Sequence, residues 1–213
     1  GRDPGIYRRR VDDAAGELSP PERLAVLEKP AYLAFSPDQR HLYAVHAVEK
    51  ESVVSAYTRQ ADGTLTFLNR QPTGGSGGCH LSVDATGRTL LVAHYGSGSV
   101  AALPIAPDGS VQPAVAPPLA LSGTGPHPRR QTRPHPHSLA ADPENRLAYC
   151  GDLGTDRIRI FRLHAGDAVL EEIGSGTVPP GGGPRHLALG PGVLYACNEM
   201  GVSVTTFARA GDG

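Results

Sequence analysis

An arginine and a glutamate are expected to meet at the end of one β-hairpin. The segment HLALGPGVLYACNE, which begins at His186, turns about its Pro-Gly pair, so Arg185 should lie opposite Asn198 or Glu199 within one residue of register. A guanidinium beside a carboxylate can stabilise developing negative charge, and it can also be a salt bridge that only supports the fold. His137, from the preceding repeat, is expected beside this pair, which favours the chemical interpretation.

Two histidines flank a proline in the HPH phrase at His135 to His137. Alternate residues of an extended strand face the same side, so both imidazoles could be metal ligands. A third ligand would have to come from His186, Asp152 or Glu199, and no spacing fixes which one. We therefore predict no metal and no other cofactor.

Other polar residues lie at the starts of first strands and the ends of second strands in the same repeat. In an antiparallel hairpin these two positions lie at one end. His46, His80 and His94 occur there, and the simplest interpretation is an imidazole hydrogen-bonded within a polar channel lining. On a separate loop, the phrase GTGPHPRRQ carries Arg129 and Arg130, which could bind an anionic group or simply face solvent.

The elements that position these residues come from a phrase that occurs four times. It reads YLAFSPDQRHLYAV from Tyr32, HLSVDATGRTLLVA from His80, HSLAADPENRLAYC from His137 and HLALGPGVLYAC from His186. Each copy has two apolar runs around a turn, which predicts a β-hairpin, and a second pair of runs with a polar turn follows most copies. Four short strands per repeat are typical of a propeller blade, so we predict an all-β propeller with four-stranded antiparallel blades.

The repeat divides the chain into a series of blades. We predict half a blade at 1–29, whole blades at 30–77, 78–134 and 135–183, and part of a blade at 184–213. The stretch from Pro117 to Ser138 is the one long insertion, and long loops in compact folds are usually functional. Propellers have about four to eight blades. Either the two incomplete blades join to close a four-bladed ring or, as we expect, the protein continues at both ends.

The composition narrows the class of protein. Gly and Pro account for 27 and 20 of the 213 residues, which disfavours helices. The 20 Lys and Arg nearly balance the 21 Asp and Glu, so the charge predicts neither nucleic-acid nor membrane binding. The 3 cysteines are too few for a disulfide framework, and we expect them to be reduced in a cytoplasmic protein of unknown oligomeric state.

The order of the phrases resembles a known family. GGCHLSVDATGRTLLVAHYGSGSV, RRQTRPHPHS, GDLGTDRI, GGGPRHLA and ACNE follow one another as in the lactonase family of seven-bladed β-propellers. The resemblance covers practically the whole chain and implies that about four of seven blades are present. The family phrases ANYGGG and GPCH read AHYGSG and GGCH here, which bears on the contacts expected with substrate.

The resemblance implies a site in the central channel built on a histidine, an arginine and a glutamate. On this sequence they are His137, Arg185 and Glu199. Glu199 or His137 would activate water and the other would deliver the proton, while Arg185 would stabilise the oxyanion or anchor the anion of the substrate. A further arginine is expected from a later blade, after Gly213. The predicted substrate-binding residues are His135, His186, Gln131, Asp152, His80 and Asn198.

The activity that the resemblance implies is hydrolysis of a sugar-acid lactone, with 6-phosphogluconolactone of the pentose phosphate pathway as the leading substrate. No serine lies in a GxSxG motif, which disfavours an acyl-enzyme mechanism. One alternative is a cycloisomerase that forms a muconolactone, in which His137 or Glu199 protonates a carbon and Arg185 holds a carboxylate. Another is a propeller without activity that binds proteins, and a third is a chain that is inactive without its remaining blades.

Overall fold

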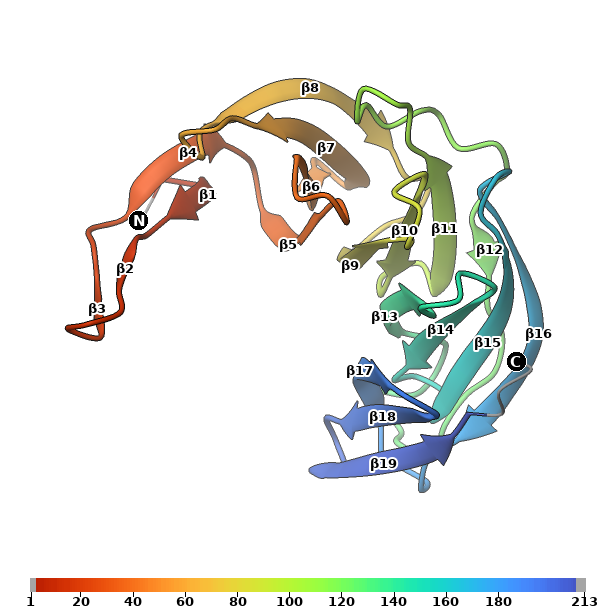
Figure 1. Ribbon diagram of the computed structural model, residues 1–213. Coiled ribbons are helices and arrows are strands. Elements are labelled where there is room, and N and C mark those ends of the chain that lie inside the picture. Colours follow the sequence, from red (N-terminus) through yellow and green to blue (C-terminus); the bar gives the residue numbers. More distant parts are fainter. Residues whose placement is uncertain (1–2, 210–213) are drawn as a thin grey trace.

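The computed structural model describes residues 3–209, and Figure 1 shows them as a curved row of β-sheets. All regular elements in this part of the chain are strands, as the high Gly and Pro content predicted. No helix there is long and apolar enough to cross a membrane. The prediction of an all-β propeller with antiparallel blades is confirmed.

Three sheets have four antiparallel strands in sequence order, and each is one blade. The first contains β5 (Pro30–Phe35), β6 (His41–Val48), β7 (Glu51–Arg59) and β8 (Leu65–Pro72). The second contains β9 (Gly78–Val83), β10 (Thr89–His94), β11 (Ser99–Pro104) and β12 (Leu119–Ala120). The third contains β13 (Pro136–Ala141), β14 (Leu147–Asp152), β15 (Arg157–His164) and β16 (Val169–Thr177). A further sheet has three strands, β17 (Pro184–Gly190), β18 (Val193–Asn198) and β19 (Ser203–Ala208).

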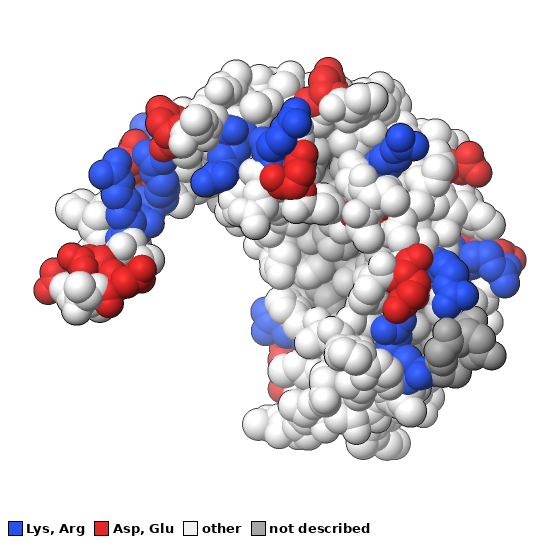
Figure 2. All heavy atoms as spheres, viewed as in Figure 1, with Lys and Arg blue, Asp and Glu red and all other residues white. Residues whose placement is uncertain are grey.

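The N-terminal segment forms a pair of strands beside the first blade. β1 (Gly5–Arg8) pairs with β4 (Glu22–Val26), and a small hairpin of β2 (Val11–Asp12) and β3 (Glu17–Leu18) lies between them. Figure 1 shows this hairpin projecting from the row of sheets, and acidic side chains gather at its tip in Figure 2.

The fourth strand of the second blade differs from the prediction. In this blade the second pair of runs is VAALPIAPDGSVQPA from Val100, so the run after its turn at Pro107 to Gly109 would be the fourth strand, but it forms only an isolated bridge between Ile105 and Val111. The fourth strand is instead the two-residue β12, which lies within the predicted insertion. The segment between carries Pro113 and two more prolines at 117–118, which cannot donate to a strand ladder.

Neighbouring sheets pack face to face through apolar side chains. In β10, Leu90 and Val92 belong to the core shared with the first blade, whereas Leu91 and Ala93 belong to the core shared with the third. Because successive side chains of a strand point to opposite faces, a central strand between two blades is apolar at consecutive positions. This is why the inner strands read as continuous apolar runs.

The first strands of the blades, β5, β9, β13 and β17, line the concave side of the row (Figure 1). The N-terminal strands and the last sheet lie at opposite ends of an open arc and do not meet in this view. The described residues therefore do not form the closed four-bladed ring that the repeat count allowed.

A one-residue β-bulge interrupts the first strand of every blade at the same place. The extra residues are Ala31, Cys79, His137 and Arg185. This register corrects the alignment of the repeats, in which His137 was matched to His80. The residue equivalent to His80 is Ser138, and His137 instead shares its position with Arg185. A bulge turns a side chain away from the regular alternation, so these residues can face the hollow of the arc.

Candidate active site

Arg185 and Glu199 form the ion pair predicted from the hairpin register. Arg185 is the bulge residue between the pairs Pro184–Asn198 and His186–Cys197. Its Nη1 lies 3.0 Å from Glu199 Oε2, and about half of the arginine side chain is exposed. The backbone N–H of Glu199 donates to the carbonyl of Gly183 at 2.9 Å, which holds the glutamate at the end of β18.

A second arginine reaches the same carboxylate from the long insertion. Arg130 Nη2 donates to Glu199 Oε1 at 2.8 Å, and it also lies 3.4 Å from the hydroxyl oxygen of Tyr95. The sequence placed Arg130 on a loop that could bind an anion, and in the structure that anion is a carboxylate of the chain itself. The two oxygens of Glu199 are thus each held by a different guanidinium.

These contacts determine the charge of Glu199. Partial burial would raise the pKa of its carboxyl group, but the hydrogen bond from Arg130 and the charges of Arg130 and Arg185 outweigh it and lower the pKa below the usual value. Glu199 is therefore ionised at neutral pH. The partially exposed cluster carries one negative and two positive charges.

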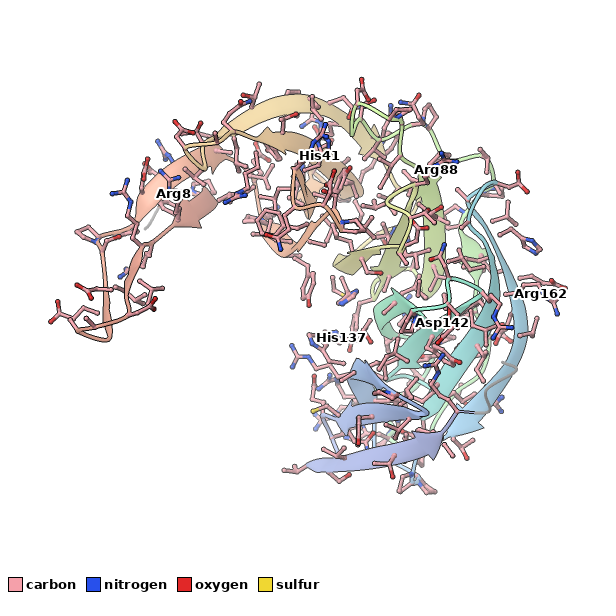
Figure 3. All side chains as sticks on the ribbon, viewed as in Figure 1. Arg8, His41, Arg88, His137, Asp142 and Arg162 are labelled. Atoms are coloured by element: carbon pink, nitrogen blue, oxygen red, sulfur yellow. The ribbon has the colours of Figure 1, made fainter. Side chains whose placement is uncertain are left out.

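His137 lies beside this cluster on the concave side of the arc, at the start of β13 (Figure 3). Its ring centroid is 5.5 Å from that of His186 and 5.6 Å from that of Tyr95. The Sγ of Cys79, the equivalent bulge residue of the preceding blade, is 4.0 Å from His137 Nδ1. Burial lowers the pKa of His137, and the nearby charges of Arg185 and His186 lower it further. The imidazole is therefore neutral at neutral pH and can accept a proton.

An aromatic cluster continues from His186 along the concave side. The His80 ring is 5.7 Å from that of His186 and 4.3 Å from that of Tyr32. Burial, together with the neighbouring histidines, lowers the pKa of His80 to about 3. Its Nδ1 accepts a hydrogen bond of 3.3 Å from the backbone N–H of Leu139. His80 is thus a neutral part of the site wall. Within residues 3–209, no group of three or more His, Cys, Asp and Glu has an arrangement that could hold a metal ion.

Asp152 and Asn198 are buried at the last position of the second strand in their blades. The carboxylate of Asp152 accepts hydrogen bonds from the backbone N–H of His135 and from the guanidinium of Arg159. The amide of Asn198 donates to hydroxyl groups at 203 and 205. Both residues tie a second strand to its neighbours. These bonds give Asp152 and Asn198 a structural role, and direct contact of either residue with substrate stays a prediction.

Gln131 and His135 hold the residues that surround the Arg130–Glu199–Arg185 cluster. Gln131 is fully buried, and its amide bonds the backbone N–H of His127 at 2.9 Å and the carbonyl of Leu153 at 2.9 Å. His135 donates from Nδ1 to the carbonyl of Tyr95 at 2.8 Å and stacks on the Tyr95 ring at 4.2 Å. Gln131 and His135 were predicted to contact substrate. In the structure, Gln131 positions the loop of Arg130 and His135 positions the ring of Tyr95.

Asp156 is a supporting residue that the sequence did not single out. Its Oδ1 accepts from Gln131 Nε2 at 2.6 Å and from the backbone N–H of Gly183 at 2.8 Å, and its Oδ2 accepts from that of Gly181 at 2.6 Å. One buried carboxylate thus connects the loop of Arg130 to the segment that leads to Arg185. The phrase GDLGTD contains Asp156, but Asp152 was the residue of this phrase predicted to contact substrate.

The fold and this cluster define a β-propeller with an arginine–glutamate–histidine site on the concave edges of its blades. Residues 1–213 match the family described as lactonase, 7-bladed β-propeller. The chain belongs to this family, which confirms the resemblance seen in its phrases.

Similar proteins with known names agree with this assignment. The chain is 39% identical over 197 residues to a 6-phosphogluconolactonase of Bacillus subtilis, covering 92% of this chain and 55% of that protein. It is 33% identical over 204 residues to a 6-phosphogluconolactonase of Yersinia pestis, covering 94% and 57%. The chain therefore spans little more than half the length of these relatives.

Solved structures show the same fold. The periplasmic gluconolactonase of Pseudomonas aeruginosa matches with a TM-score of 0.86 and 30% identity, over 99% of this chain and 62% of that one. A protein from Lactobacillus plantarum matches with a TM-score of 0.84 and 26% identity, over 98% of this chain and 63% of that one.

Proposed function

We propose that the intact protein hydrolyses a sugar-acid lactone, with 6-phosphogluconolactone as the preferred substrate and 6-phosphogluconate as the product. The observation that carries this proposal is the ion pair of Arg185 and Glu199 beside the neutral imidazole of His137. The names of the relatives from Bacillus subtilis and Yersinia pestis support the choice of substrate.

His137 is the proposed base. It takes a proton from a water molecule, whose oxygen attacks the carbonyl carbon of the lactone. Arg185 stabilises the oxyanion that forms, and its position is held by Glu199. When the ring C–O bond breaks, the departing alkoxide takes the proton back from His137. Glu199 also stabilises the transient imidazolium, because its negative charge raises the pKa of His137.

The charge state of His137 disfavours the cycloisomerase alternative. Protonation of a carbon needs a group that carries a proton before the reaction. Burial and neighbouring charges lower the pKa of His137, and the pKa of Glu199 is also below its usual value, so both groups are deprotonated at neutral pH. A base that accepts a proton from water fits this state better than an acid that supplies one.

We further propose that the protein works in the cytoplasm on a small-molecule lactone. Cys79, Cys150 and Cys197 are free, and Cys197 is exposed, which suits a reducing compartment. One similar protein, the gluconolactonase of Pseudomonas aeruginosa, is periplasmic, so the compartment is tested directly. Fractionation of cells that produce the intact protein, with detection by antibody, decides between the two compartments.

The experiment that tests the activity replaces His137 by Gln in the intact protein. The expected result is a loss of kcat/KM on 6-phosphogluconolactone of about 10²- to 10⁴-fold, the usual contribution of a general base. His164→Gln is the matched control, because His164 is about half exposed at the last position of β15, the third strand of its blade. Unchanged turnover in His137→Gln would contradict the proposal. Loss of muconate diene absorbance without lactone hydrolysis by the wild-type protein would favour the cycloisomerase.

A further inference from the structure

The loop that carries Arg130 is built to hold that residue at the site. It lies between β12 and β13, and its turn is fixed because the Nδ1 of His127 accepts the backbone N–H of Arg130 at 3.1 Å. The buried Gln131 then fastens the turn to Leu153 and, through Asp156, to the segment that precedes Arg185. The backbone at Arg130 is therefore positioned by buried contacts on both sides of the insertion.

The side chain of Arg130 is much less restrained than its backbone. It is 44% exposed, and among the described residues its side chain contacts Glu199 and the hydroxyl of Tyr95. Ion pairs with this degree of exposure contribute little to stability, so breaking the pair of Arg130 and Glu199 costs little free energy. Glu199 keeps a second guanidinium, Arg185, after Arg130 has left. The pair of Arg130 and Glu199 can thus open without leaving a carboxylate unpaired.

An arginine in this setting is suited to a phosphate group. The guanidinium presents several donors in a plane and can bind a phosphate group in a bidentate manner, whereas its contact with Glu199 uses one carboxylate oxygen and a partly exposed ion pair. We propose that Arg130 binds the phosphate group of a phosphorylated lactone and that its hydrogen bond moves from Glu199 Oε1 to that group when the substrate arrives. This inference rests on the proposed function and names the residue that recognises the phosphate of the proposed substrate.

The exchange would couple substrate recognition to the chemistry. In the free protein the charge of Glu199 is shared by two guanidiniums. After the exchange Glu199 faces only Arg185 and His137, so its negative charge is less compensated. That change favours the imidazolium that forms at His137 when water is activated. A lactone without a phosphate would leave Arg130 on Glu199 and would react more slowly.

The test compares two substrates in the intact protein, 6-phosphoglucono-δ-lactone and glucono-δ-lactone. Arg130→Gln is expected to lower kcat/KM for the phosphorylated lactone on the order of 10- to 100-fold, as for the loss of one charge-assisted hydrogen bond. For glucono-δ-lactone we expect no loss but a small gain, within about threefold, because Arg130→Gln leaves Glu199 with Arg185 alone. Arg129→Gln is the matched control, because it removes the same charge from the same turn and the Arg129 side chain forms no ion pair within residues 3–209.

Each other outcome overturns the inference. Equal losses on both substrates would mean that Arg130 only positions Glu199, and no loss on either would mean that it has no role. An equal effect of Arg129→Gln would assign the effect to the overall charge of the loop.

If the wild-type protein hydrolyses neither lactone faster than the spontaneous reaction, the proposed function fails. The phosphate inference is then decided by calorimetric binding of 6-phosphogluconate and gluconate. Tighter binding of 6-phosphogluconate that is lost in Arg130→Gln supports the inference, and equal binding of the two compounds overturns it.

Discussion

At the scale of single residues, His137 lies between opposing charges. Burial lowers the pKa of its imidazole, and Arg185 and His186 lower it further, whereas the carboxylate of Glu199 raises it. The base is therefore in its neutral, active form near pH 7. It becomes protonated only below the ordinary histidine value of 6.5, so kcat/KM should be steady at neutral pH and fall on the acidic side of that value.

The two neighbours of His137 should move this acidic limb in opposite directions. Glu199→Gln removes a charge that raises the pKa of His137, so the limb should shift to lower pH. Arg185→Gln removes a charge that lowers the pKa, so the limb should shift to higher pH. The measurement is kcat/KM for the lactone as a function of pH in each variant of the intact protein. Shifts in the same direction would show that the limb belongs to another group.

Some site residues were predictable from the sequence and others were not. The contact of Arg185 with Glu199 follows from the register of one short hairpin, so it could be predicted. The contact of Arg130 with Glu199 joins residues 69 positions apart through a loop without periodicity, so no pattern indicates it. The role of Asp152 could not be predicted either. A polar residue at the end of a strand has the same sequence pattern whether its side chain faces a channel or bonds to neighbouring residues of the sheet.

At the scale of elements, the β-bulge in each first strand builds the site. It gives His137 and Arg185 equivalent places in the first strands of successive blades, and these strands line the hollow of the arc (Figure 1). Alternation of apolar residues predicted the hairpins well, since turns such as DATG and DPEN mark them clearly. A single inserted residue leaves that alternation almost unchanged. The repeat was therefore found from the sequence while its register at His137 was off by one.

The segment that connects the third blade to the last sheet should be sensitive to substitution of Gly183. Its φ is +63°, and an added Cβ would lie 2.9 Å from Met200 Sδ. Its carbonyl also accepts the N–H of Glu199. Gly183→Ala should cost about 1 to 2 kcal/mol of stability and should lower kcat/KM, because the strain falls on the backbone that holds Glu199.

Gly192 provides the control for that prediction. Its φ is +67°, in the turn between β17 and β18, and an added Cβ would have no neighbour within 4 Å. Gly192→Ala should have a similar cost from the left-handed backbone, about 1 kcal/mol, without a change in kcat/KM. Urea unfolding and lactone turnover of both variants provide the comparison. Equal turnover of the two variants would mean that Gly183 does not affect the position of Glu199.

At the scale of the whole molecule, stability comes from a series of cores between adjacent sheets. Phe161 of β15 is fully buried in the core that the second blade shares with the third. A different set of residues, with Tyr43 and Leu103 among them, forms the core between the first and second blades. Because each sheet contacts mainly its neighbours, damage to one core should remain largely local.

Phe161→Ala tests this arrangement. Loss of a buried phenylalanine should lower the free energy of unfolding by about 3 to 5 kcal/mol. Amide hydrogen exchange should rise most in the strands from β10 to β16, which contribute to that core, and least in β5 to β8, which do not. Phe67→Ala is the matched control, since Phe67 is 57% exposed and its loss should cost less than about 1 kcal/mol. A uniform rise in exchange across all the sheets would instead mean that the blades unfold as one cooperative unit.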